Sequence, residues 1–371
     1  MKIICRQSVL LNNINLVLKA ASGRTTLPIL QCILLKADDG VLKLTGNDLE
    51  LGVETKPFTA EVMKPGGVAL EARMLSEIMR RLPDDNVLIS VDERNLTTIQ
   101  CGKVEFKIAG LPEEDFPYIQ SVEKENKITI PEVTLKNMIK QTLFSVAQEE
   151  NKPVFTGELL EVKNGQLNLV SVDGFRVSLR TTKLETAQDK TVNIVIPGKT
   201  LGELVKIMSD EADLEVNIYF TDKHVLFELS NCVVVSRLLE GEFLKYDQVF
   251  TTDHTTLVNA SKDELLQSLE RASLISRDIK KNPVKLEIGS GSGIILSSQT
   301  ETGTSREEIE VEMDGSELTI AFNPKYLIDA LKVIDDERIL IKFTTSLSPC
   351  TISAVEGDDY KYLVLPLKLN I

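Results

Sequence analysis

The residues with the clearest chemical pattern are basic, and they form two columns that recur at a fixed offset of 126 residues. The first column is Arg73, Lys199 and Lys325, and the second is Arg80, Lys206 and Lys332. Repeated cations on equivalent helix faces can hold the phosphates of a polyanion without reading its bases. A solvated helix face is the plainer interpretation, and the residues alone leave both open.

Few residues point to catalysis. The two histidines, His224 and His254, have no companion at the spacing of a metal site or a catalytic pair. Nucleotide-binding and zinc-protease motifs are absent from the sequence. The acidic groups at 113–115 and 335–337 fall in expected turns, where solvated charge is the ordinary explanation. We therefore expect no catalytic residue, no metal and no cofactor. A nuclease or transferase that uses the second acidic group is the lower-ranked enzyme alternative.

Length and composition set the broad class. The chain has 371 residues, 42% of them hydrophobic, and a net charge of −14. At about 100–150 residues per domain, this length predicts two or three domains. Net charge bears on solubility and steering, so an acidic total does not exclude a local basic surface. Five scattered cysteines without a CxxC pair predict free buried thiols. Without a signal peptide or membrane span, we expect a soluble cytoplasmic protein.

The basic columns belong to three predicted helices. Apolar residues at i, i+3, i+4 and i+7 define the helices Arg73–Leu82, Lys199–Met208 and Lys325–Ile334. At ~100° per residue, the basic columns point roughly 150° away from the apolar stripe. An acidic turn and a strand follow each helix; the strands are Val87–Val91, Leu214–Phe220 and Arg338–Phe343.

A second helix and a hairpin also recur. The helices are expected at Ser8–Ala21, Thr134–Ala147 and Ser261–Leu274. The hairpins turn at Asp39-Gly40, at Asn164-Gly165 and within Gly289–Gly293. The repeat predicts an α+β fold of three similar domains, each with two helices packed on antiparallel sheets. We place the domains at residues 1–122, 128–250 and 253–371.

The whole chain resembles the β subunit of bacterial DNA polymerase III, the family of sliding clamps. Three segments carry the resemblance most specifically: Gly110–Pro117 (GLPEEDFP), Ser171–Val177 (SVDGFRV) and Tyr362–Leu369 (YLVLPLKL). The resemblance implies the DNA-clamp fold and a head-to-tail homodimer, whose six similar domains make a ring around duplex DNA. It also implies a non-enzymatic processivity factor that tethers the replicative DNA polymerase and other replication and repair proteins.

The resemblance assigns roles to particular residues. It turns the basic columns toward the duplex and adds the loop residue Arg24 as a DNA contact. It places Phe106 and Ile108 of the first domain against Leu274 and Ile275 of the third domain of a second copy. The implied partners are double-stranded DNA without sequence preference, a second copy of the chain, the replicative polymerase, the clamp loader and other proteins with a clamp-binding motif, but no membrane.

The resemblance also implies a hydrophobic pocket for partner peptides between the second and third domains. Its residues would be Phe155, Gly174, Phe175, Arg176, Val177, Leu244, Val249, Asn323, Tyr326, Leu363, Val364, Leu365, Pro366, Leu367, Lys368 and Leu369. From its residues alone, the last segment is an alternating terminal strand that Pro366 restricts to a sheet edge. Phe175 stands where the family often has histidine, and Leu244 where it often has proline. We expect these departures to bear on peptide preference.

One alternative remains within the binding class. A repeat scaffold could recruit peptides without encircling DNA, and its basic faces would then serve solubility alone. Replacement of the six column residues by serine distinguishes the two, because the scaffold would keep normal DNA-dependent function.

Overall fold

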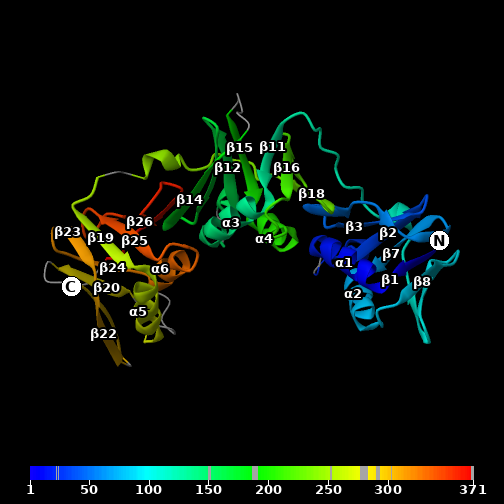
Figure 1. Cartoon of the computed structure of the whole chain (residues 1–371), viewed down its shortest axis with the longest axis horizontal. Coiled ribbons are helices and arrows are strands. Elements are labelled where there is room, and N and C mark those ends of the chain that lie inside the picture. The colour runs from blue at the N-terminus through cyan, green and yellow to red at the C-terminus, as the bar shows by residue number, and fades with distance from the viewer. Residues whose placement is uncertain are drawn as a thin grey trace. The chain divides into compact units, whose positions relative to one another are not determined.

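The fold is described from a computed structural model of the chain (Figure 1). The structure describes residues 1–21, 23, 25–148, 152–185, 191–250, 253–275, 283–289, 293–301 and 303–368. The chain forms two compact units, one of residues 1–134 and 203–238, the other of residues 135–202 and 239–371. Each unit is described by itself. The two units do not test the three predicted domain boundaries, which stay a prediction.

The first unit contains two antiparallel sheets. The smaller sheet has the strand order β10-β9-β8-β1-β6. Its strands are β1 (Lys2–Arg6), β6 (Glu61–Lys64), β8 (Asn86–Val91), β9 (Leu96–Cys101) and β10 (Val104–Ala109). The larger sheet runs β11-β16-β17-β18-β4-β3-β2-β7, with β5 (Phe58–Thr59) beside β3. Its strands are β11 (Lys127–Pro131), β16 (Glu215–Phe220), β17 (His224–Glu228), β18 (Cys232–Arg237), β4 (Leu51–Thr55), β3 (Val41–Asn47), β2 (Cys32–Asp38) and β7 (Gly66–Glu71).

Helices α1 (Gln7–Val17) and α2 (Ala72–Arg81) lie side by side in this unit (Figure 1). The short helix η1 (Leu18–Ala20) continues α1, so the predicted helix 8–21 changes to a tighter turn after Val17. The close approach of this turn to the sheet needs a glycine. A Cβ on Gly46 would lie 2.2 Å from the carbonyl oxygen of Val17. Two more short helices are η2 (Pro28–Gln31) and η3 (Glu113–Asp115).

The second unit also contains two antiparallel sheets. The larger sheet has the order β15-β12-β13-β14-β27-β26-β25-β19-β23, and the smaller has the order β22-β21-β20-β24. The larger sheet contains β15 (Val192–Pro197), β12 (Gly157–Lys163), β13 (Gln166–Val172), β14 (Arg176–Lys183), β27 (Tyr360–Val364), β26 (Cys350–Ala354), β25 (Arg338–Phe343), β19 (Thr256–Ser261) and β23 (Glu312–Gly315). The smaller contains β22 (Gly303–Glu310), β21 (Gly293–Thr300), β20 (Val284–Gly289) and β24 (Leu318–Phe322).

Helices α5 (Lys262–Leu274) and α6 (Pro324–Leu331) pack together in the second unit. Asn323 caps α6 by accepting a hydrogen bond from the Lys325 N–H at 3.1 Å, and proline occupies the first helical position, as the sequence predicts. Helices α3 (Glu132–Thr142) and α4 (Gly198–Ile207) run across the division between the units. The remaining short helices are η4 (Leu143–Ser145), η5 (Pro153–Thr156) and η6 (Tyr246–Gln248).

The repeated elements are confirmed with small changes at their ends. Helices α2, α4 and α6 match the three predicted basic helices, although α6 ends at Leu331 rather than Ile334. The turns Asp39-Gly40 and Asn164-Gly165 have positive φ at both residues, as two-residue hairpin turns require. In the third hairpin Gly289 pairs with Gly293, and residues 290–292 lie outside the described part of the chain.

The prediction of a terminal edge strand at 363–369 is wrong. Strand β27 ends at Val364 and lies between β14 and β26, hydrogen-bonded on both sides. Pro366 falls two residues past the end of the strand, so its missing N–H takes nothing from the ladder. In the described ranges, no helix has both the length and the apolar character that a bilayer crossing demands.

Candidate DNA-facing helices and partner pocket

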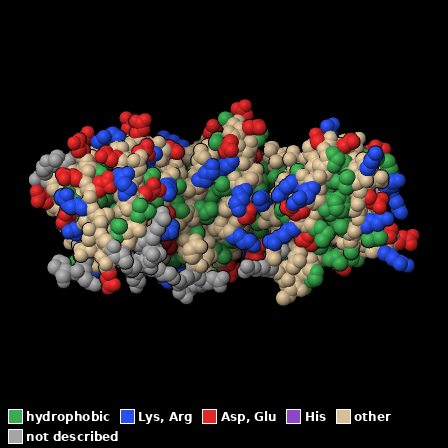
Figure 2. All heavy atoms as spheres, turned by 90° about the horizontal axis from the view of Figure 1, so that it is seen from below, with side chains coloured by type: hydrophobic (Ala, Val, Ile, Leu, Met, Phe, Trp, Pro, Cys, Tyr) green, Lys and Arg blue, Asp and Glu red, His purple; other side chains and the backbone are tan. Residues whose placement is uncertain are grey.

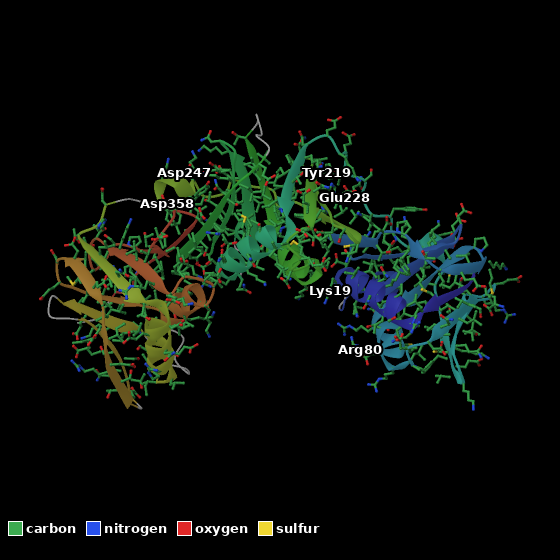
Figure 3. All side chains as sticks on the ribbon, viewed as in Figure 1. Lys19, Arg80, Tyr219, Glu228, Asp247 and Asp358 are labelled. Carbon is green, nitrogen blue, oxygen red and sulfur yellow. The ribbon has the colours of Figure 1, made fainter. Side chains whose placement is uncertain are left out.

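The six column residues are all exposed on the helix faces opposite the core. In α2, Leu75 and Met79 are buried while Arg73 and Arg80 are exposed, and α4 and α6 repeat this division. Arg80 lies on the side of α2 that faces away from the sheets (Figure 3). The amphipathic period of the sequence therefore fixes the side on which the cations lie. Arg24 lies outside the described residues.

A third column accompanies the two basic ones, and the sequence prediction missed it. Glu77, Glu203 and Asp329 are also spaced by 126 residues. Glu77 is 3.3 Å from Arg80, Glu203 is 2.8 Å from Lys206, and Asp329 is 2.6 Å from Lys325. Figure 2 shows acidic side chains interspersed among Lys and Arg on the face viewed from below. The fixed offset was the signal that could have revealed this column.

The predicted peptide pocket lies within the second unit and begins at the turn between β13 and β14. The carboxylate of Asp173 accepts hydrogen bonds from the backbone N–H groups of Phe175 at 2.9 Å and Arg176 at 3.1 Å. Gly174 stands in this turn with φ +91°, a conformation that favours glycine. The turn presents Phe175, which is 55% exposed and stacks on the ring of Tyr326 with a centroid separation of 6.3 Å.

Arg176 connects this turn to α6 and η4. Its guanidinium donates to the Asp173 carboxylate at 2.8 Å, to the Asp329 carboxylate at 2.9 Å and to the carbonyl oxygen of Phe144 at 2.7 Å. It also lies 4.5 Å from the ring centroid of Tyr326. Burial opposes the charged form, but Tyr362 and the two carboxylates outweigh burial and raise the pKa of Arg176. The side chain is therefore a fixed cation at the floor of the site.

The apolar wall of the pocket comes from segments far apart in sequence. Val177 and Leu363 are buried in one cluster, and Phe155, Leu244 and Val249 pack against it. The Phe155 ring meets Phe243 edge to face at 5.6 Å. The hydroxyl of Tyr246 bonds to the Glu161 carboxylate, which anchors η6 and the wall beside it to β12. Phe243, Tyr246 and Phe250 belong to the same apolar cluster, which the sequence did not predict because nothing local links them to Val177 or Leu363.

The segment after β27 borders the pocket. The Leu365 N–H donates to the carbonyl oxygen of Phe175, and the Leu367 N–H donates to that of Ala321, both at 2.8 Å. Leu365 is 38% exposed, whereas Val364 is buried within β27. The structure thus gathers Phe155, Val177, Leu244, Val249 and Leu363 in one apolar cluster. Arg176 and Phe175 contact Tyr326 of α6, and Asn323 caps that helix. Leu369 lies outside the described residues, and Pro366 and Lys368 continue the segment.

The residues predicted for the dimer interface lie at exposed edges. Phe106 is 38% exposed and Ile108 is half-buried on β10, an edge strand of its sheet. In the second unit Leu274 is 53% exposed at the end of α5, and Ile275 follows it. Exposed apolar side chains on an edge strand invite pairing with another chain.

The described residues include neither a metal-binding group nor a reactive thiol. They contain no group of three or more His, Cys, Asp or Glu side chains that could hold a metal ion. The five cysteines are buried, and burial raises the pKa of Cys32 to about 11 and of Cys232 to about 12. Such thiols remain protonated near neutral pH and make poor nucleophiles.

Comparison with known proteins decides the family. Family models of the DNA polymerase III beta subunit match the N-terminal domain at residues 1–120, the central domain at 129–245 and the C-terminal domain at 247–368. The beta sliding clamp of Bacillus subtilis (strain 168) is 36% identical, with 99% of this chain and 100% of the relative covered. The chain belongs to the family of DNA polymerase III β subunits.

Solved structures agree with this assignment. A DNA polymerase III beta subunit from Eubacterium rectale has a TM-score of 0.95 at 41% identity, with both chains fully covered. The sliding clamp from Bacillus subtilis has a TM-score of 0.96 at 36% identity, covering 100% of this chain and 99% of that one. The predicted α+β clamp fold of three similar domains is confirmed. The chain is a DNA sliding clamp of processive replication, and it is a processivity factor rather than an enzyme.

Proposed function

We propose that two copies of the chain join head to tail into a ring, with the basic columns of α2, α4 and α6 facing the enclosed duplex. Six exposed cations on three equivalent helix faces are the observation that carries this proposal. Such cations bind phosphates without sequence preference, so a closed ring can hold DNA and still slide. The core-facing sides of the same helices supply the rigidity that positions them.

Two bare edge strands support the head-to-tail arrangement. Strand β10 ends one sheet of the first unit, and β22 ends one sheet of the second. Strand β10 carries one glutamate and one lysine, with Lys103 just before it, whereas β22 carries one arginine and three glutamates. The acidic β22 should therefore pair better with β10 of another copy than with a second β22. Phe106 and Ile108 from one copy would then lie close to Leu274 and Ile275 of the next.

The pocket around Arg176 would take short peptides from the replicative polymerase, the clamp loader and other clamp users. Its exposed Phe175 and Leu365 provide apolar contact area, and the buried Arg176 holds the turn that presents Phe175. Phe175 replaces a commonly found histidine with a larger apolar ring, which favours peptides with an apolar or aromatic residue at that point.

Replacement of all six column residues by serine tests the DNA assignment. We expect duplex binding at about 50 mM salt to fall by orders of magnitude, and the dependence of log K on log salt to flatten, because each lost phosphate contact removes about 0.9 from the slope. The matched control replaces six exposed cations outside these helices by serine: Lys56, Lys64, Arg94, Lys103, Lys223 and Lys245. Equal effects in both variants, or normal binding by the first, would support the peptide scaffold instead.

A further inference from the structure

Each of the three basic helices contains one acidic residue, and it always stands in the same place. Glu77, Glu203 and Asp329 are the single acidic side chains within residues 73–82, 199–208 and 325–334. Each comes four residues after the first basic column and three before the second. At ~100° per residue, the acid lies between the two cations on the same helix face. Glu77 is 53% exposed, whereas Glu203 at 23% and Asp329 at 20% lie closer to the helix surface, beneath their cations.

The carboxylates engage the cations that are proposed to hold phosphates. Arg80 bonds to Glu77 at 3.3 Å, Lys206 to Glu203 at 2.8 Å and Lys325 to Asp329 at 2.6 Å. Lys332 differs, because its partner at 2.8 Å is Glu270 of α5. At least four of the six column residues thus already have an acidic partner within 3.3 Å.

These pairs are accessible enough to exchange. The side chains of Arg80, Lys206 and Lys325 are 57%, 55% and 68% exposed, so each cation can turn toward solvent. Their acidic partners are 53%, 23% and 20% exposed. Exposed ion pairs are weak and open readily, so a phosphate can replace the carboxylate, but only in competition with it. The same acid also places negative charge next to each incoming phosphate, which lowers the net attraction further.

We propose that Glu77, Glu203 and Asp329 form an attenuating column that competes with DNA phosphates for the basic columns. The column lowers the affinity of the ring for duplex and eases its movement from one phosphate to the next. This inference rests on the proposed function, because the helix faces must meet DNA for the competition to occur. In this proposal the acidic residues set the strength of DNA binding, whereas the cations make the contacts to phosphates.

Helix stabilisation is the simpler explanation of the same pairs. Pairs at i,i+3 and i,i+4 do stabilise helices, but the order matters, and an acid that follows its lysine by four residues is the less favourable order. Asp329 follows Lys325 in that order. Glu77 and Glu203 precede their cations, which is the favourable order, so helix stabilisation predicts lower thermal stability without them. The test therefore measures thermal unfolding as well as DNA affinity. Asp329 also accepts a hydrogen bond from Arg176 in the pocket, so the test uses the other two acids.

The test compares two double variants of equal charge change in the full-length protein. The first is Glu77→Gln with Glu203→Gln, which removes two attenuating carboxylates. The control is Glu93→Gln with Glu114→Gln, two exposed acids outside these helices. Binding to a short linear duplex with free ends is measured across a salt series, together with thermal unfolding. Glutamine matches glutamate in helix propensity, so the helices should persist.

The first variant should bind duplex about three- to tenfold more tightly than the control at about 50 mM salt, with a slope of log K against log salt steeper by about 1–2. Equal affinities of the two variants would overturn the proposal, as would a change in thermal unfolding without a change in affinity. The six-serine variant distinguishes a failure of this inference from a failure of the proposed function. If the six-serine variant no longer binds DNA while the two glutamine variants have equal affinity, only the attenuating role is wrong. If the six-serine variant binds DNA normally, the proposed function is wrong as well.

Discussion

Arg176 is the side chain on which most polar contacts of the pocket converge. Its side chain is 7% exposed, and it bonds to two carboxylates and one carbonyl oxygen contributed by three separate segments. A planar guanidinium can serve several acceptors in fixed directions at once, which an ammonium group cannot do. The residue therefore holds the turn that presents Phe175 against α6, and peptide binding and local stability should both depend on it.

Arg176→Lys should weaken both properties. Lysine keeps the positive charge but lacks the several N–H donors of the planar guanidinium. We therefore expect the free energy of unfolding to fall by about 1–3 kcal/mol. We also expect a partner peptide to bind about tenfold more weakly. Chemical denaturation and peptide titration measure the two effects. Arg180→Lys is the matched control on the same strand, because Arg180 makes only a longer contact, 3.8 Å, with Asp359. Equal losses in both variants would contradict the role given to Arg176.

Glu158 is a second residue whose environment sets a measurable property. It is fully buried on β12, and neither carboxylate oxygen has a hydrogen-bond partner among the described residues. Thr142 lies close by, but its hydroxyl donates to the carbonyl oxygen of Met138 at 2.9 Å. Burial raises the pKa of Glu158 to about 8. The folded protein therefore keeps this carboxyl group protonated at neutral pH.

The free energy of unfolding should therefore depend on pH through Glu158. Because the folded pKa exceeds the unfolded value of 4.5, the stabilisation is complete below that value and is lost as the pH rises toward 8. Glu158→Gln, which keeps a neutral side chain, should flatten this decline and gain a few kcal/mol at about pH 9 relative to the native chain. The exposed Glu215→Gln serves as the control. If the free energy of unfolding changes with pH in the same way for Glu158→Gln and the native chain between pH 5 and pH 9, this account is wrong.

Among the elements, the edge strand β10 has the most direct consequence for assembly. All of its residues except Ile108 are exposed, and its outer backbone groups have no strand partner in its sheet. At the opposite edge of the same sheet, β6 carries the exposed Met63. Both edges could in principle recruit another strand, but only β10 holds the residues expected at the dimer interface.

If β10 forms the proposed dimer interface, Phe106→Asp should convert the proposed dimer into monomers. A buried carboxylate without a partner costs several kcal/mol, enough to shift the monomer–dimer equilibrium by two or more orders of magnitude. Sedimentation measures the mass, with Met63→Asp as the control on the other edge. A dimeric Phe106→Asp variant, or a monomeric Met63→Asp variant, would place the interface elsewhere.

At the scale of the whole molecule, the proposed ring makes a topological prediction. Electrostatic binding weakens steeply with salt, whereas a closed ring on circular DNA has no end from which to leave. We expect the loaded protein to remain on closed circular DNA at salt that removes it from linear duplex. Linearising the circle with a restriction enzyme should release it, as measured by gel filtration of the DNA fraction. Equal retention on circular and linear DNA would show that the protein does not encircle its substrate.

Features that depend on near neighbours along the chain could be predicted from the amino-acid order alone. The apolar stripes and basic columns of α2, α4 and α6 follow from a period of 3.6 residues, and the hairpin turns follow from Asp39-Gly40 and Asn164-Gly165. The repetition of the helices at 126 residues, and of the first two hairpins at 125, also predicted the three-domain class. Such patterns can be recognised without knowing the fold, because local backbone geometry sets helix faces and tight turns.

Contacts between segments far apart in the chain became known only from the folded structure. The pocket wall joins Phe155, Leu244 and Leu363, and the floor joins Arg176 to Asp329, 153 residues away. The placement of β27 inside its sheet also escaped prediction, because Pro366 suggested an edge until the strand was seen to end at Val364. Contacts of this kind depend on the free energy of the whole packed unit, which no local window of sequence contains.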